Sequence, residues 1–161
     1  MGLQAAWNKG CEKLINSDQI VVKSDAALNN EKSLNKSMDK KPTIYVASNI
    51  RFIDFWKKLR DSGVVISSTW IDHVPEKGDK EAISRLWLNC FEEIRQSDMI
   101  MVKAEKEDRL KGVLAEIGAA LVLGKPVYLV GENNNLGDIY HHPLFYKVSS
   151  PEEAITHFAE R

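Results

Sequence analysis

The sequence predicts a three-layer α/β domain built on a mostly parallel sheet. From residue 43 onward, short apolar runs rich in β-branched residues alternate with longer segments whose apolar side chains recur at helical spacing. Strands and helices that alternate in this way form right-handed βαβ units, with helices on both faces of the sheet. With 161 residues, 43% of them hydrophobic, the chain is long enough to bury one substantial core.

The predicted strands are short apolar runs, which are typical of strands buried on both faces. They lie at residues 44–47 (IYVA), 64–67 (VVIS), 99–102 (MIMV), 126–130 (PVYLV) and, with a weaker pattern, 145–148 (FYKV). Helices are predicted between and after them. The first has apolar residues at Phe52, Phe55, Trp56 and Leu59, and the second at Ile83, Leu86, Trp87, Cys90, Phe91 and Ile94. The third runs from a cap at Asp108 to a closing Gly124, and the last begins at Ser150 and Pro151.

The first 41 residues differ in composition from the rest. Residues 24–41 are rich in Asn, Lys and Ser, which is typical of a linker. Ahead of them, Trp7, Cys11 and Leu14 have the spacing of a short amphipathic helix, and residues 20–22 (IVV) have the composition of a strand. We therefore divide the chain into an N-terminal extension and linker at residues 1–41, expected to be partly disordered, and an α/β domain at residues 42–161.

Charge and composition exclude several classes of protein. The 22 basic and 23 acidic residues leave a net charge of -1, which disfavours a protein that coats a nucleic-acid polymer. No apolar run approaches a membrane span, and residues 1–13 lack the pattern of a signal peptide. Cys11 and Cys90 cannot build a disulfide framework or a four-thiolate zinc site. We expect a soluble, cytoplasmic protein.

The sequence has no standard motif for a cofactor or a metal. A glycine-rich dinucleotide fingerprint and a Walker lysine motif are both missing. His141 and His142 are adjacent, which rarely lets both face one metal, and no further ligand at suitable spacing joins them. We therefore expect no metal and no cofactor.

Ligands of parallel α/β folds bind beyond the carboxyl ends of the strands, so the residues after each strand are the candidates. After the first strand, the hydroxyl of Ser48, the amide of Asn49 and the cation of Arg51 lie at a helix start, which suits a phosphate or a carboxylate. The alternative is that Ser48 or Asn49 caps the helix and Arg51 is solvated. After the second strand, Trp70 either stacks on a base or belongs to the core, and Asp72 follows it.

Glu116 is the most informative candidate. It is the one charged residue between Leu114 and Leu123. A carboxylate there costs several kcal/mol unless it is paired or its pKa is raised, and such a cost often marks a functional group. The alternative is a structural ion pair with Arg109 or a lysine. Gly112, one turn earlier, would leave open space for a ligand.

These residues resemble the nucleoside 2-deoxyribosyltransferase-like superfamily, which includes deoxynucleoside 5'-monophosphate N-glycosidases, over about residues 43–158. The resemblance rests on residues 44–51 (IYVASNIR), 67–71 (SSTWI), 94–102 (IRQSDMIMV) and 111–131 (KGVLAEIGAALVLGKPVYLVG). The last block is the most specific. A glycine followed four residues later by glutamate, then by glycine and an Ala-rich stretch into GKPV, is similar to the nucleophile helix of that family.

The resemblance implies a flavodoxin-like fold with a five-stranded parallel sheet, and a homodimer or higher homo-oligomer. It implies cleavage of the N-glycosidic bond of a (2'-deoxy)nucleoside or nucleoside monophosphate without metal or cofactor. Glu116 would attack the anomeric carbon, and a base or water would then displace the glycosyl-enzyme ester. One departure stands out. Where the family commonly has an aspartate eight residues before Asp98, this chain has Cys90. Four acids remain open as substitutes: Asp72, Asp79, Glu105 and Asp108.

Two other functions remain open. Cys90 and the N-terminal extension favour a catalytically inactive module of the same fold that binds or senses a nucleotide. A glycohydrolase of NAD-like dinucleotides is a third possibility, which no residue favours specifically. We also expect the aromatic surface of the helix bearing Trp87 and Phe91 to support self-association.

Overall fold

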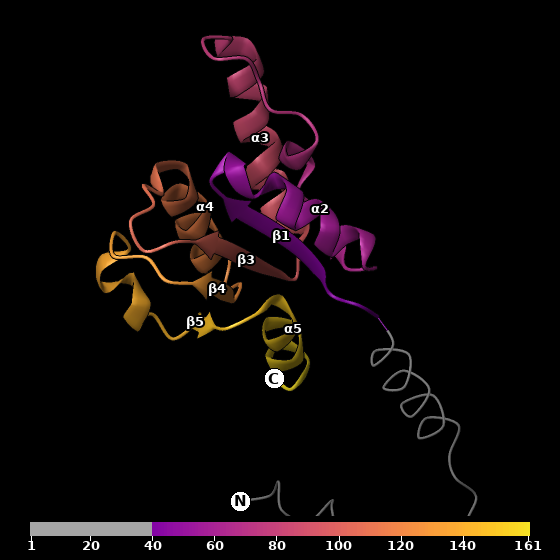
Figure 1. Cartoon of the computed structure of the whole chain (residues 1–161), viewed down its shortest axis with the longest axis vertical. Helices are drawn as coiled ribbons and strands as arrows, with labels where there is room; N and C mark the ends of the chain where they lie inside the picture. The colour runs from indigo at the N-terminus through magenta and orange to yellow at the C-terminus, as the bar shows by residue number, and fades with distance from the viewer. Residues whose placement is uncertain (1–39) are drawn as a thin grey trace, which may run out of the picture. The chain divides into compact units, whose positions relative to one another are not determined.

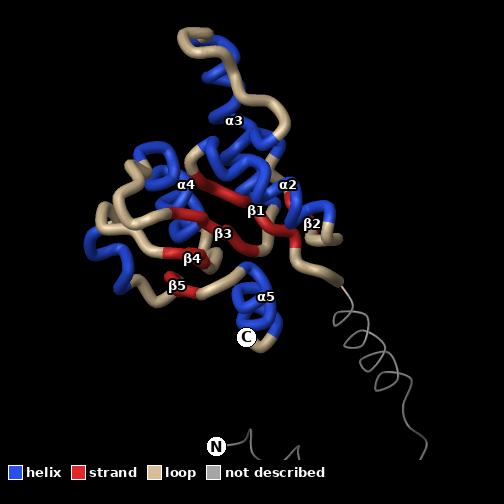
Figure 2. The backbone as a smooth tube through the Cα atoms, in the orientation of Figure 1, coloured by secondary structure: helices blue, strands red, loops and turns tan. Residues whose placement is uncertain are grey.

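The computed structural model describes residues 40–161. The expected N-terminal helix and strand, and nearly all of the linker, lie outside these residues, so the division at residue 41 stays a prediction. The described residues form a five-stranded sheet in the order β2-β1-β3-β4-β5, and all of its neighbouring strands are parallel. Figure 1 and Figure 2 show this sheet with helices packed around it. The three-layer α/β prediction is confirmed.

The strands match the apolar runs of the sequence. They are β1 (Thr43–Ser48), β2 (Val65–Ile66), β3 (Met99–Ala104), β4 (Val127–Gly131) and β5 (Phe145–Val148). The centres of β1, β3 and β4 are buried on both faces, as their unbroken apolar composition predicts. The edge strand β2 is shorter than predicted. Val65 is exposed there, because β2 pairs with β1 on one side alone.

Helices follow every strand. They are η1 (Ile50–Phe52), α2 (Ile53–Asp61), η2 (Thr69–Ile71), α3 (Lys80–Gln96), α4 (Lys111–Val122), η3 (Gly137–His141) and α5 (Pro151–Ala159). Successive side chains of β1 point to opposite faces of the sheet, so their contacts show which helix covers each face. Tyr45 points toward α4, whereas Ser48 is hydrogen-bonded by Trp56 of α2. No helix within residues 40–161 is long and apolar enough to cross a bilayer.

The helix ends confirm two predictions and correct a third. Ser150 caps α5, with Pro151 in its first turn, and Gly124 ends α4 with φ +69°. Asp108, in contrast, does not cap α4, which begins at Lys111 after Leu110. The carboxylate of Asp108 accepts hydrogen bonds from the Glu105 backbone N–H and from Arg51 instead. These local donors hold Asp108 in the loop before the helix.

The strand order places the binding crevice. The chain passes from β1 to β2 on one side and then crosses to β3 on the other side of β1. The loops after β1 and β3 therefore turn away from each other and leave a crevice at the carboxyl ends of these strands. Gly131 closes the neighbouring strand β4 with φ +112°, where a Cβ would overlap the carbonyl oxygen of Ala104.

Candidate active site

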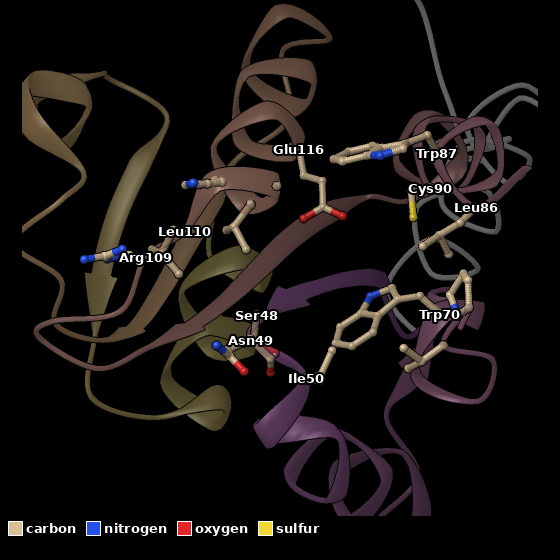
Figure 3. Close-up of a pocket in the computed structure, with 15 residues that line it drawn as sticks. Ser48, Asn49, Ile50, Trp70, Leu86, Trp87, Cys90, Arg109, Leu110 and Glu116 are labelled. Carbon is tan, nitrogen blue, oxygen red and sulfur yellow. The ribbon is translucent and has the colours of Figure 1, made fainter. Parts of the chain in front are cut away.

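A cavity of about 210 Å³ lies at this crevice, between α3 and α4. Figure 3 shows the side chains that line it. They come from the end of β1 and the start of η1, from η2 and the loop after it, from α3, and from α4 and the loop before it. They are Ser48, Asn49, Ile50, Trp70, Val74, Pro75, Leu86, Trp87, Cys90, Arg109, Leu110, Lys111, Gly112, Val113 and Glu116. The structure thus brings together five of the predicted site residues: Ser48, Asn49, Trp70, Gly112 and Glu116.

Glu116 is buried at the wall of this cavity. It is 8% exposed, and its Oε1 accepts a hydrogen bond of 2.6 Å from the phenol of Tyr45. Burial raises the pKa of Glu116 to about 7, with a smaller contribution from the charge of Glu93, while the Tyr45 hydrogen bond opposes the rise. The predicted alternative, an ion pair with Arg109 or a lysine, is wrong. No salt bridge to Glu116 occurs among residues 40–161.

Tyr45 is a site residue that the sequence analysis missed. It lies in the centre of β1, fully buried, 71 positions before its partner Glu116. Burial and then the charge of Glu116 raise the pKa of Tyr45 far above its usual range, so the phenol keeps its proton and remains a donor. A signal was present in the sequence, because a tyrosine in a strand buried on both faces needs a polar partner for its hydroxyl.

Cys90 completes this buried group on the α3 side. It is 4% exposed and lines the cavity. Burial raises the pKa of its thiol to about 11, against a smaller lowering by Tyr45. Cys90 is therefore a protonated thiol at neutral pH. This environment suits a small buried residue, as its place on the apolar face of the helix predicted.

Two indole rings form walls of the cavity. Figure 3 shows the carboxylate of Glu116 between Trp87 on one side and Trp70 on the other. The core role predicted for Trp70 is confirmed, because it is buried and donates from Nε1 to the Val46 carbonyl at 2.8 Å; it also lines the cavity, and stacking on a base stays a prediction. Gly112 lines the cavity next to Trp87, since a Cβ there would lie 3.4 Å from Cη2 of that ring, and its role beside a ligand stays a prediction.

Ser48 and Asn49 line the cavity but are already engaged. The Ser48 hydroxyl accepts a hydrogen bond of 2.8 Å from Trp56 Nε1 and donates to the Asn49 carbonyl. The Asn49 Oδ1 accepts from the Arg51 backbone N–H at 3.1 Å and caps η1. The capping alternative thus holds for Asn49.

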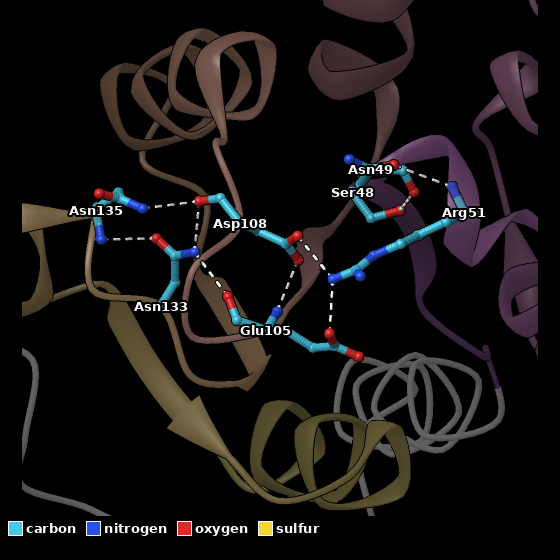
Figure 4. Close-up of polar contacts among 7 residues, drawn as sticks. All are labelled: Ser48, Asn49, Arg51, Glu105, Asp108, Asn133 and Asn135. Carbon is cyan, nitrogen blue, oxygen red and sulfur yellow. Dashed lines mark hydrogen bonds and ion pairs between the residues drawn. The ribbon is translucent and has the colours of Figure 1, made fainter.

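Arg51 belongs to a separate polar network, drawn in Figure 4. Its guanidinium lies 2.7 Å from both the Glu105 and the Asp108 carboxylates. Asn133, which is 3% exposed, donates to the backbone carbonyls of Glu105 and Asp108 and so ties the loop after β3 to the loop after β4. Arg51 does not line the cavity. It is neither free for a phosphate nor merely solvated, because two carboxylates neutralise it.

The four acids left open as substitutes for Cys90 all lie outside the cavity lining. Asp72, predicted to bind substrate, is 2.7 Å from Arg60, and this arginine lowers its pKa. Asp79 caps α3 by accepting from the Ala82 backbone N–H at 2.9 Å. Glu105 and Asp108 are held by Arg51. His141 and His142 do not line the cavity either, and the described part of the chain contains no group of three side chains that could hold a metal.

No protein-family model matches this sequence, and no curated protein matches it. Among solved structures, it is similar to a 2-deoxyribosyltransferase from the psychrotolerant bacterium Bacillus psychrosaccharolyticus, with 22% identity and a TM-score of 0.56. This likeness covers 70% of the present chain and 90% of the other. The chain shares the fold of that transferase. The family resemblance seen in the sequence is confirmed at the level of the fold.

A second solved structure is the CMP N-glycosidase BcmB of Clostridium botulinum. It has 14% identity and a TM-score of 0.43, over 74% of this chain and 99% of the other. That TM-score is too low to establish a common fold.

Proposed function

We propose that this protein cleaves the N-glycosidic bond of a 2'-deoxynucleoside or its monophosphate, with Glu116 as the nucleophile. One observation carries the proposal. A buried carboxylate, hydrogen-bonded by a neutral phenol and paired with no cation in residues 40–161, points into a cavity walled by two indoles. A carboxylate kept at such a cost is typical of a reactive group.

The geometry suits attack on an anomeric carbon. The Tyr45 hydrogen bond orients Glu116 through Oε1 and leaves Oε2 for the substrate. The same bond lowers the pKa of Glu116 against the effect of burial, so that a large share of the carboxylate is ionised near neutral pH. Ionised Glu116 would attack C1', and the electron pair of the C1'–N bond would leave with the base. Water or a second base would then attack C1', break the ester C1'–O bond and restore the carboxylate; the proton that this nucleophile loses balances the one that the departed base takes from solvent.

The fold supports this proposal without deciding it. A shared fold hosts many activities, so the site, rather than the solved transferase, supports the assignment. The likeness of the chain to a 2-deoxyribosyltransferase makes a nucleoside a reasonable ligand for a cavity at the carboxyl edge of this sheet. Trp70 and Trp87 provide apolar faces against which a base can stack.

The test is release of free base from a panel of deoxynucleosides, deoxynucleoside monophosphates and NAD, measured by chromatography. We expect release by the wild-type protein and by Glu81→Gln, a control that removes a carboxylate exposed on α3. Glu116→Gln should release none within the same time. Binding of panel members without release by any variant would contradict the proposal and indicate a nucleotide-binding module.

We also propose that the chain forms a homodimer or a higher homo-oligomer. Trp87 faces the cavity rather than a partner, but other large apolar side chains on α3, on α4 and just after α4 are exposed. These are Leu88, Phe91, Leu114, Val122 and Leu123. Val122 is 89% exposed, an unusual position for an aliphatic side chain on a helix without a partner. Light scattering at micromolar concentration should show a mass above the monomer, and a strictly monomeric species would contradict this.

A further inference from the structure

The cavity lining near Glu116 is mostly apolar, whereas recognition of a nucleobase usually needs hydrogen-bond partners for its polar edge. Figure 3 shows Trp70, Trp87 and Leu86 near the Glu116 carboxylate, and Val74 and Pro75 are further apolar residues of the lining. The Trp70 indole N–H is already bonded to the Val46 carbonyl. A flat ring can stack between these walls. Among residues 40–161, Asn49 has the one side-chain amide in the lining, and its Oδ1 already accepts from the Arg51 backbone N–H.

The cavity also offers no acid to the departing base. Within residues 40–161, Glu116 is the one carboxylate in the lining, and it is needed as the attacking group. Neither buried neighbour of Glu116 is a useful proton donor. Tyr45 directs its proton to Glu116, and burial raises the pKa of the Cys90 thiol to about 11. Glu93, whose charge acts on Glu116, lies outside the lining and accepts hydrogen bonds from the Thr69 backbone N–H and hydroxyl. The other candidate acids are held by Arg51, by Arg60 and at the α3 N-terminus.

A missing acid restricts the leaving group. When Glu116 attacks C1', the electron pair of the C1'–N bond passes to the base nitrogen. Without a proton, a neutral base has to leave as an anion, which is a poor leaving group. These residues supply no such proton. A base that already carries a positive charge through N-alkylation takes the same electron pair and leaves as a neutral molecule. It needs no proton.

We propose that the substrate of this site is an N-glycoside whose base is a cationic, N-alkylated heteroaromatic ring, an inference that rests on the proposed function. Two indoles beside a carboxylate suit such a ring, because cations bind to tryptophan faces and the carboxylate adds an attractive charge. The lining also contains two cationic residues, Arg109 and Lys111, and neither lies beside the two indoles. Figure 3 shows Arg109 pointing away from the cavity, and Lys111 is exposed at the start of α4.

The complete reaction balances without a general acid. Glu116 forms a bond to C1' as the C1'–N bond breaks, so the cationic base departs neutral and the glycosyl-enzyme ester is neutral. Water then attacks C1', the ester C1'–O bond breaks, and its electron pair restores the Glu116 carboxylate. The water adds its oxygen and one hydrogen to the sugar, and its other proton passes to solvent.

The kinetic test compares two substrates that differ by one methyl group. We expect kcat/KM for 7-methyl-2'-deoxyguanosine, whose base is cationic, to exceed that for 2'-deoxyguanosine by at least about a hundredfold. Cleavage of the neutral substrate within about tenfold of the cationic one would overturn the inference while leaving the proposed function intact. Release from neither substrate nor from any other panel member would instead count against the proposed function.

Equilibrium binding tests the inference independently of turnover. By calorimetry, the cation N1-methylnicotinamide should bind at least about tenfold more tightly than neutral nicotinamide. Trp87→Leu should remove this preference and Trp87→Phe should keep part of it. Phe91→Leu, which removes an aromatic ring beside Trp87 but outside the cavity lining, is the matched control and should keep it fully. Equal affinity for the two ligands in the wild-type protein would overturn the inference.

A gain-of-function variant adds a further check. Cys90→Asp would place a carboxyl group beside Tyr45, where a proton can reach the departing base. We expect it to raise cleavage of neutral substrates about tenfold or more, with little change for the cationic ones. If a folded Cys90→Asp protein leaves the ratio between the two substrates unchanged, the missing acid is not what limits the leaving group.

Discussion

The carboxyl edge of the sheet contains two groups of carboxylates with opposite environments. Glu105 and Asp108 surround the Arg51 guanidinium, both at 2.7 Å, in a network open to solvent at Glu105. Glu116, on the helix that follows them, is buried against the neutral Tyr45. The first group is compensated by a cation and organises two loops. The second has no such compensation among the described residues, and its pKa rises accordingly.

This contrast shows how one residue type serves two purposes. A carboxylate that is exposed and paired is a stable structural element whose individual contribution is small. A buried carboxylate without a cation destabilises the folded state and is correspondingly reactive. The residue type is therefore less informative than the partner and the solvent around it.

The largest expected effect comes from neutralising the uncompensated carboxylate. Glu116→Gln keeps the volume and the hydrogen-bond acceptor for Tyr45 but removes the attacking charge. Base release should fall by about a thousandfold or more, while ligand affinity stays within about tenfold because ground-state contacts remain. Steady-state kinetics and calorimetry measure the two quantities. A structural role would give the reverse result, with high residual activity and a lower melting temperature.

The same variant should also change how stability depends on pH. The pKa of Glu116 is about 7 in the folded protein and 4.5 is its ordinary value, so between these pH values the folded state holds a proton that the unfolded chain has released. The free energy of unfolding of the wild type should therefore fall as pH rises through this window, by about 3 kcal/mol. Urea denaturation at about pH 4 and about pH 8 should show Glu116→Gln gaining stability relative to the wild type at the higher pH.

Activity should follow ionisation of the same group. Below the Glu116 pKa of about 7, kcat/KM should rise about tenfold per pH unit, and above it the profile should level off. The fall from neutral pH to about pH 5 is therefore about a hundredfold. A profile that is flat across this range would show that Glu116 is not the ionising nucleophile.

Tyr45→Phe sharpens the comparison by removing the one side-chain hydrogen bond to Glu116 found within residues 40–161. The phenol lowers the pKa of Glu116, so its loss should move the acid limb of the profile to higher pH. We expect about a tenfold loss of activity near neutral pH, recovered in part at higher pH. Loss of activity at every pH with an unchanged limb would instead indicate damage to the cavity.

The smallest effect is expected in the compensated network. Arg51→Ala removes a cation that is nearly half exposed; Glu105 stays in contact with solvent, and Asp108 keeps the hydrogen bond from the Glu105 backbone N–H. Arg51→Ala should lower the melting temperature by less than Tyr45→Phe does. The acid limb of the kcat/KM–pH profile should not shift. A selective loss of activity on monophosphates would restore the assignment of Arg51 to a phosphate.

Much of the architecture was determined by the sequence itself. The runs at residues 44–47, 99–102 and 126–130 form buried strands because their β-branched and apolar composition fits a sheet covered on both faces. Glu116 was identifiable because its own helix surrounds it with apolar residues, which makes its burial a local property. Caps at Ser150 and Gly124 depend likewise on neighbouring backbone groups.

Only the tertiary structure decided which hydrogen-bond and ion-pair partners the polar side chains have. Tyr45 reaches Glu116 across 71 residues, and Arg51 meets Glu105 and Asp108 across more than 50. Asp72 was predicted to bind the substrate, but it pairs with Arg60 outside the cavity lining. A single sequence shows which side chains need compensation. Which groups provide it depends on how strand order and helix packing bring distant segments together, because Coulomb and hydrogen-bond energies depend on separation in space and on exclusion of water.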